Sequence, residues 1–161
     1  MKRKLFALFL TVCTVLSLAV MPASAIDESS GVVQTVRAMG ILVGDTNGNL
    51  ALDRNVTRAE FAKMAVAAST YRDSVGDGTG SSLFKDVKSD YWASAYIKIA
   101  VEQGWMVGYT DGTFRPSRTI SLEEACTTVL RILGYDSSDL AGSYPSAQLT
   151  KASAIGLRDD I

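Results

Sequence analysis

Residues 84–135 decide the fold, and they read FKDVKSDYWASAYIKIAVEQGWMVGYTDGTFRPSRTISLEEACTTVLRILGY. Two apolar patterns in this stretch have the i, i+3, i+4, i+7 spacing of a helix face. They consist of Trp92, Ala95, Tyr96 and Ile99, and of Ala125, Thr128, Val129 and Ile132. Between them, residues 108–116 read GYTDGTFRP, a composition typical of a tight turn. The stretch therefore predicts a helix, a loop and a second helix, and such a pair needs neighbours to bury both apolar faces.

The sequence before this stretch supplies a neighbour, because the pattern repeats. A shift of 64 positions places residues 40–44, GILVG, on residues 104–108, GWMVG. The same shift places residues 56–60, VTRAE, on residues 120–124, ISLEE. We therefore expect two copies of one helix–loop–helix unit, packed against each other.

A third, partial copy follows the second. Residues 151–157 match residues 99–105, and the copy ends at Ile161, before its loop and second helix. The expected divisions are a signal peptide at 1–25, a first repeat with a remodelled head at 26–72, a flexible linker at 73–83, a second repeat at 84–135, a linker at 136–143 and a truncated third repeat at 144–161.

The first 25 residues have the pattern of a secretory signal peptide. Lys2-Arg3-Lys4 gives a basic start, an apolar run follows at 5–20, and Ala23-Ser24-Ala25 forms a small-residue cleavage site. The apolar run of about 16 residues is shorter than the roughly 20 that a membrane-spanning helix needs. This favours cleavage over a membrane anchor and predicts a secreted protein.

The motifs together resemble the S-layer homology (SLH) family. Residues 84–87, Trp92-Ala93 and the turn at 108–116 match the first three parts of the family pattern, and residues 56–60 match the fourth. The resemblance covers nearly everything after about residue 29. It implies an all-α fold in which the units pack as a pseudo-threefold helical bundle.

The resemblance also implies a function. SLH modules hold bacterial surface proteins to an anionic, often pyruvylated, cell-wall polysaccharide, so it implies a non-catalytic anchor at the cell wall or S-layer. Binding would use grooves between adjacent repeats, where an arginine and backbone N–H groups receive a carboxylate and aromatic rings cover sugar faces.

Composition argues against several other functions. The chain has 16 Lys+Arg, 17 Asp+Glu and no His, and loss of the signal peptide removes three basic residues, which leaves a net charge of −4. A mildly acidic domain is a poor candidate for nucleic-acid binding. The lack of histidine excludes Ser-His and Cys-His catalysis and the commonest metal ligand. Cys126 is interpreted as a small buried residue, and we expect no enzyme activity, metal or cofactor.

Two helix starts carry the same capping pattern. Thr57 with Glu60, and Ser121 with Glu124, form S/T-x-x-E capping boxes, in which each side chain accepts from a backbone N–H of the other residue. Glu60, Ser121 and Glu124 are therefore interpreted as structural caps.

Arg58 is the leading candidate for ligand binding. A cation in the first turn opposes the helix dipole, but a guanidinium beside a helix N-terminus makes an anion site. Residue type alone leaves open a pairing with Asp45 or Asp53 instead, whereas the SLH resemblance implies contact with the acidic group of the polymer. The second repeat has Leu122 and Glu123 at this place, so we expect no anion site there.

The turn of the second repeat carries further candidates. Gly108 and Gly112 allow backbone angles that other residues resist, and Tyr109 and Arg115 are the exposed candidates for contact with a saccharide. The complete set of ligand-binding candidates is Thr57, Arg58, Asp86, Trp92, Gly108, Tyr109, Asp111, Gly112 and Arg115.

Three of the remaining side chains have two interpretations each. Asp86 caps the following helix or lines a groove, and the cap is favoured. Trp92 packs in the core or stacks on a sugar, and the spacing favours the core. Trp105 replaces Ile41 of the first repeat, so packing is the simpler interpretation.

The sequence fits three alternative functions to different degrees. Residues 45–49 open like a calcium loop, but Leu50 and Val56 stand where such a loop needs Gly and a bidentate acid. An enzyme with paired carboxylates would need them across a cleft, and Glu123-Glu124 and Asp159-Asp160 are merely adjacent. The main alternative is a protein–protein module that mediates self-association of the surface layer.

Overall fold

The computed structural model describes residues 28–76 and 83–158, so the expected signal peptide and part of the first linker lie outside the described residues. The described part contains five α-helices and no strand. The α-helices are α2 (Gly31–Ala38), α3 (Arg58–Ala67), α4 (Ser94–Glu102), α5 (Leu122–Ile132) and α6 (Ser146–Ala154), with short 3-10 helices η1 (Arg72–Ser74) and η2 (Ser137–Asp139). The all-α prediction is therefore confirmed for the part of the chain that the structure describes.

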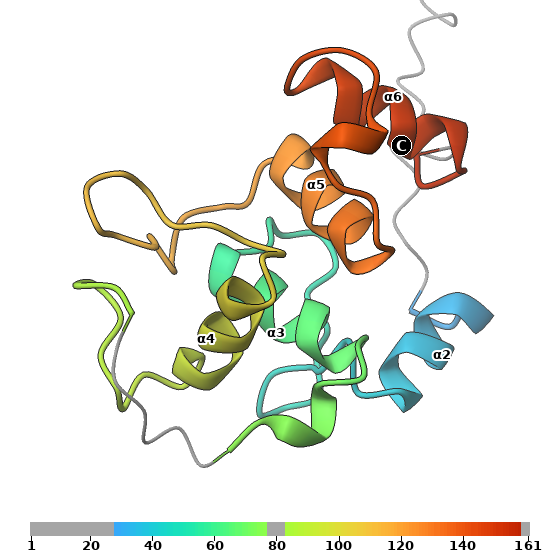
Figure 1. Cartoon of the computed structure of the whole chain (residues 1–161). Coiled ribbons are helices and arrows are strands. Elements are labelled where there is room, and N and C mark those ends of the chain that lie inside the picture. The colour runs from blue at the N-terminus through green and yellow to red at the C-terminus, as the bar shows by residue number, and fades with distance from the viewer. Residues whose placement is uncertain (1–27, 77–82, 159–161) are drawn as a thin grey trace, which may run out of the picture.

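Helix α3 is the centre of the packing. It lies against α4 and also contacts α5, and α5 in turn packs against α6 (Figure 1). Helix α2 stands to one side of this group (Figure 1). Helices α4 and α6 thus meet the rest of this group through α3 and α5.

Small side chains let α3 and α4 approach closely. Ala59, Ala62 and Val66 of α3 are fully buried against Ala93 and Ala100, which lie at the start and near the end of α4. Removal of this apolar surface from water is the main stabilising contribution, at about 25 cal/mol per Å². The larger side chains that complete the core are Val87, Ile97, Met106 and Phe114.

The face of α4 that is buried differs from the predicted one. Ser94, Ile97 and Ala100 are buried, whereas Trp92 is 53% exposed. The prediction was wrong because α4 begins at Ser94, so Trp92 lies before the helix and does not share its face. In α5 the prediction was also incomplete, because this helix packs against both α3 and α6 and buries Cys126 and Leu130 as well as Thr128.

Both capping boxes are present. Thr57 caps α3 and Ser121 caps α5, with the reciprocal bonds from the backbone of each cap residue to Glu60 and Glu124. The two cap segments also touch each other, through an isolated antiparallel bridge between Thr57 and Thr119. The helix starts of the first and second repeats are therefore held together by backbone hydrogen bonds.

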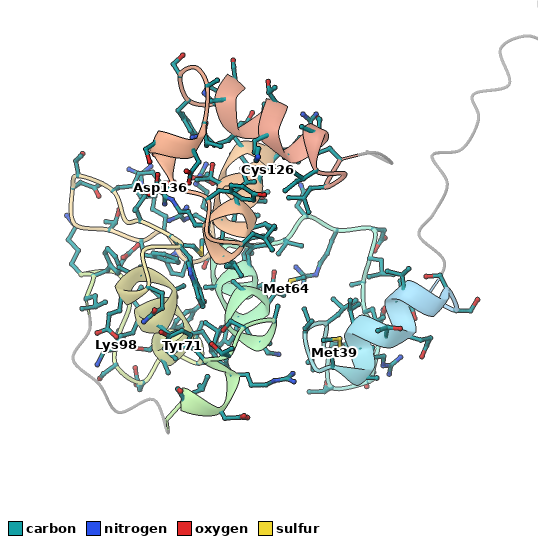
Figure 2. The ribbon with its side chains drawn as sticks, turned by 45° about the vertical axis from the view of Figure 1, so that its right-hand side comes forward. Met39, Met64, Tyr71, Lys98, Cys126 and Asp136 are labelled. Atoms are coloured by element: carbon teal, nitrogen blue, oxygen red, sulfur yellow. The ribbon has the colours of Figure 1, made fainter. Side chains whose placement is uncertain are left out.

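Cys126 is buried in α5 (Figure 2), as the sequence predicted. Burial raises the pKa of its thiol, which keeps it in the unreactive protonated form. Among residues 28–76 and 83–158, no helix is long and apolar enough to cross a bilayer.

Candidate functional site

The side chain of Arg58, in the first repeat, forms hydrogen bonds with residues of the second repeat. Its side chain is 4% exposed, and its Nε donates to the carbonyl of Phe114 at 2.9 Å. Its Nη2 donates to the carbonyl of Val107 at 2.7 Å, and its Nη1 to Glu124 Oε1 at 3.1 Å. The partner is thus Glu124 of the other repeat, and neither Asp45 nor Asp53, the two acids that the sequence suggested.

The guanidinium of Arg58 makes three hydrogen bonds and lies against two aromatic rings. Arginine has five N–H donors, and three of them are used in the bonds above. One N–H on each terminal nitrogen has no partner among the described residues. The centre of the guanidinium also lies 4.5 Å from the ring centroid of Phe114 and 5.1 Å from that of Tyr109. Burial lowers the pKa of Arg58, and Glu124 opposes this shift.

The N-terminus of α3 is closed, in contrast to the expectation that it would help to receive an anion. The N–H of Arg58 donates to the carbonyl of Arg118, and the N–H of Ala59 donates to that of Pro116. The N–H of Glu60 donates to the Thr57 hydroxyl. Any anion at this place must be held by side chains.

Glu124 is the point where the polar groups of the site converge. Its Oε1 accepts from Arg58, from the Tyr109 hydroxyl at 3.3 Å and from Arg118. Its Oε2 accepts from the N–H of Ser121 at 3.1 Å. Glu124 is therefore both the cap of α5 and the counter-ion of two arginines, and the sequence predicted only the first role.

Arg118 was also missed, although the sequence held a signal for it. The shift of 64 positions places Arg54 on Arg118 and Glu60 on Glu124. In the structure Arg54 donates two hydrogen bonds to the carboxylate of Glu60, at 2.6 and 2.9 Å, and Arg118 donates to both carboxylate oxygens of Glu124. Each repeat thus has its own arginine–glutamate pair at the helix start, and only Glu124 has a second arginine, Arg58.

Arginine side chains lie over the ring of Tyr109. Arg115 stacks over it with its guanidinium carbon 3.9 Å from the ring centroid, and Arg118 lies at 5.6 Å. Arg115 also pairs with Asp111 at 3.2 Å. These contacts fix the shape of the turn, and burial of a guanidinium against an aromatic face is favourable.

Three other candidates also shape this turn. Asp86 accepts from the N–H groups of Phe114 and Arg115 at 2.8 and 2.7 Å, so it clamps the turn. It does not cap α4, whose N-cap is Ala93 without a side-chain hydrogen bond, and that interpretation was wrong. An added Cβ at Gly108 would lie 2.0 Å from the ring of Phe84, which explains the glycine. Gly112 has a φ of 78°.

Groove 1 is a cavity of about 360 Å³ beside Arg58. Arg58, Glu124 and Arg131 give it a net positive lining, and Trp105 and Tyr144 add aromatic surface. Tyr144, just before α6, and Gln148, in α6, also line it. The other lining residues are Met106, Val107, Gly108, Tyr109, Thr127, Thr128 and Ser137.

Groove 2 is a cavity of about 500 Å³ at the equivalent place between the first and second repeats. Trp92 lines it and stands where Tyr144 stands in groove 1, after a shift of 52 positions. Met64 lines it from the side of α3 that faces α2 (Figure 2). The charged residues of its lining are Arg54, Glu60 and Lys63. The rest of the lining is apolar and consists of Val32, Val33, Ile41, Leu42, Val43, Leu50, Ala51, Leu52 and Val56.

The predicted site residues therefore divide into three groups. Arg58, Gly108 and Tyr109 line groove 1, and Trp92 lines groove 2. The others shape helix starts and the turn without lining either groove: Thr57, Asp86, Asp111, Gly112 and Arg115. Trp105 is 9% exposed, as packing predicts, and it also lines groove 1.

These features define an all-α protein, in the part that the structure describes, with two grooves among its helices. The S-layer homology domain matches residues 23–62 and 83–126, and the chain belongs to this family. The domain is a non-catalytic, cell-surface anchoring module of S-layer and cell-wall proteins.

Relatives agree with this assignment. The chain is 31% identical to a middle cell wall protein of Brevibacillus brevis over 80% of its own length and 12% of the relative's. It is 30% identical to a surface-layer 125 kDa protein of Lysinibacillus sphaericus over 95% of its length and 13% of the relative's. It is 36% identical to a cellulosome-anchoring protein of Acetivibrio thermocellus over 70% of its length and 24% of the relative's. The chain thus spans between 12% and 24% of the length of these relatives.

Proposed function

We propose that this chain anchors a secreted bacterial protein to an anionic, pyruvylated cell-wall polysaccharide through groove 1. The observation that carries this proposal is the buried guanidinium of Arg58, which lines a cavity with aromatic walls and already bonds one carboxylate there, that of Glu124. A guanidinium binds a carboxylate with two parallel hydrogen bonds, and aromatic rings cover the apolar faces of sugars.

Charge supports the same proposal. The whole chain has a net charge of −1, so its overall field does not attract an anion. Arg58 and Arg131 outnumber Glu124 in the lining of groove 1, which makes this place locally positive. Arg131 is oriented by a bond from its Nη1 to the carbonyl of Trp105.

The arrangement of the units is part of the proposal. Repeats at 26–72, 84–135 and 144–161 would form a pseudo-threefold bundle, in which each junction forms one groove. The packing of α3 on α5 and of α5 on α6 supports this arrangement, and so does the equivalence of Trp92 and Tyr144.

The test is co-sedimentation of the mature chain with purified cell walls. Arg58→Lys keeps the charge but loses the planar fork, so we expect it to weaken binding about tenfold, whereas Arg115→Lys should bind like the unaltered chain. Walls from which the polysaccharide has been removed chemically should bind neither protein. Equal binding of the two variants would count against groove 1.

A second function is supported by one observation. Leu122 occupies the position equivalent to Arg58 but is 39% exposed, and Leu133, directly after the other end of α5, is 55% exposed. Exposed apolar side chains of this kind suit protein–protein association in a surface layer. Under this alternative, walls stripped of polysaccharide would still capture the chain.

A further inference from the structure

Glu124 stands in the place where a ligand carboxylate would be received. Its Oε1 accepts from the Nη1 of Arg58 and from the hydroxyl of Tyr109, and both of these residues line groove 1. Its side chain is 22% exposed and lines the groove as well. The chain therefore holds a carboxylate of its own on the donors that an anionic saccharide would use.

We propose that Glu124 is an internal competitor, which a ligand carboxylate must displace from Arg58. This inference rests on the proposed function and adds the residue that limits affinity and sets specificity. A neutral sugar brings nothing that can replace Glu124 on the guanidinium. The carboxylate of an acidic sugar can replace Glu124 on the guanidinium of Arg58, and Glu124 then keeps its ion pair with Arg118.

The alternative partner is the structural reason why the displacement is feasible. Arg118 bonds to both oxygens of Glu124, and Ser121 donates to Oε2 as part of the capping box. Only the contacts of Oε1 with Arg58 and Tyr109 would be exchanged. Nε and Nη2 of Arg58 stay on the carbonyls of Phe114 and Val107, so the side chain remains in place.

The first repeat supplies a matched control. Glu60 is the equivalent residue in the capping box of α3, and it bonds to Arg54 and Thr57 but to no second arginine. Gln suits the same capping position, so Glu60→Gln and Glu124→Gln make the same chemical change at two equivalent helix starts. They differ in that only Glu124 bonds to Arg58.

The experiment measures binding of a methyl hexopyranoside with a 4,6-linked pyruvate ketal, and of its uncharged methyl ester, by ligand-observed NMR titration. Glu124→Gln removes the competing charge, so its affinity for the acid should rise about threefold to tenfold. Its affinity for the ester should not change. Glu60→Gln should bind both probes like the unaltered chain, and thermal unfolding confirms that both variants are folded.

Several outcomes would overturn the proposal. The proposal is wrong if Glu124→Gln binds the acid no more tightly than the unaltered chain does. It is also wrong if Glu124→Gln gains as much affinity for the ester as for the acid, or if Glu60→Gln gains as much affinity for the acid as Glu124→Gln. If the unaltered chain binds the acid and Arg58→Lys weakens this, the proposed function survives such a result. If neither walls nor the acid bind the unaltered chain, the proposed function fails and this inference fails with it.

A second measurement does not depend on a variant. In a structure of the unaltered chain with the acid bound, the ligand carboxylate should occupy the Nη1 of Arg58. The distance from Nη1 to the Glu124 carboxylate should then exceed its present 3.1 Å by more than 1 Å. A bound ligand with the Arg58–Glu124 pair intact would refute the displacement.

Discussion

At the scale of single residues, Arg58 combines a structural role with the proposed binding role. Its three hydrogen bonds reach residues 49, 56 and 66 positions further along the chain. A buried charge is tolerated because it is paired and hydrogen-bonded, and the two carbonyls that it satisfies belong to the turn of the second repeat. The same side chain that would bind the ligand therefore holds two repeats together.

The replacement Arg58→Ala should destabilise the fold by about 3 kcal/mol, because it removes a buried charge-assisted bond to the carbonyl of Phe114 and partly buried bonds to the carbonyl of Val107 and to Glu124. Arg115→Ala should cost less than about 1 kcal/mol, since Arg115 is 47% exposed and its partner Asp111 is similarly exposed. Urea unfolding of both variants checks this. Equal costs would show that the buried bonds of Arg58 contribute little.

This result also decides how binding data are interpreted. A loss of wall binding in Arg58→Ala has two explanations, loss of the ligand contact and loss of the turn that forms groove 1. Arg58→Lys separates them, because it keeps a cation at the site and changes the geometry of the donors. The binding assays therefore use the lysine variant, with stability measured on the same preparation.

At the scale of elements, the sequence predicted the helix starts well and the buried faces less well. The capping boxes are local, so four residues at 57–60 and at 121–124 were enough to identify them. Trp92 was assigned to the core because its spacing matches the stripe of α4, but the helix begins two residues later. Burial depends on which neighbours pack against a helix, and a single sequence does not specify them.

The hydrogen-bond partners of Arg58 could not be predicted from the sequence for the same reason. The repeat alignment placed Glu60 on Glu124, yet it gave no sign that Arg58 would reach across to Glu124, which is 66 positions away. Arg54 and Arg118 coincide in the alignment and were still overlooked, because an exposed arginine in a turn has no distinctive local pattern. Contacts between repeats require the packed structure.

The capping box of α3 predicts how stability depends on pH. Hydrogen bonds, first from Arg54 and also from Thr57, lower the pKa of Glu60 to about 2 from an ordinary value of 4.5. A carboxyl whose pKa is depressed in the folded state contributes stability that is present above pH 4.5 and lost as the pH falls through about 2. Glu60→Gln should therefore be less stable than the unaltered chain at neutral pH, and the difference should shrink between about pH 4.5 and pH 2.

Urea unfolding midpoints of the two proteins across this pH range measure the difference. Glu102→Gln is the control, because Glu102 is 51% exposed and pairs with Lys98 at 3.9 Å. Its stability should follow that of the unaltered chain at every pH. A Glu60→Gln difference that stays constant as the pH falls would show that the pairing with Arg54 does not stabilise the fold.

At the scale of the whole molecule, the two grooves are related by the repeat but differ in chemistry. Each groove is lined by two cations and one acid, Arg58, Arg131 and Glu124 in groove 1 and Arg54, Lys63 and Glu60 in groove 2. They differ in that the arginine paired with the acid is buried in groove 1, at 4% exposure, and exposed in groove 2, at 54%. Leu122, at the position that matches Arg58 in the second repeat, lines neither groove, so no second buried arginine of this kind is present among the residues that line them. A ligand that carries a carboxylate should therefore choose groove 1.

The chain has two tryptophans, and each groove contains one. Trp105 lines groove 1 at 9% exposure, and Trp92 lines groove 2 at 53%. In Trp92→Phe the emission comes from Trp105 alone, and the pyruvylated hexoside should change its intensity or wavelength in a saturable way. In Trp105→Phe only Trp92 remains, and its emission should stay constant over the same titration.

The methyl ester serves as the control for non-specific quenching. A saturable change in Trp105→Phe with none in Trp92→Phe would place the ligand in groove 2, where hydrophobic contact rather than the buried arginine would have to account for binding.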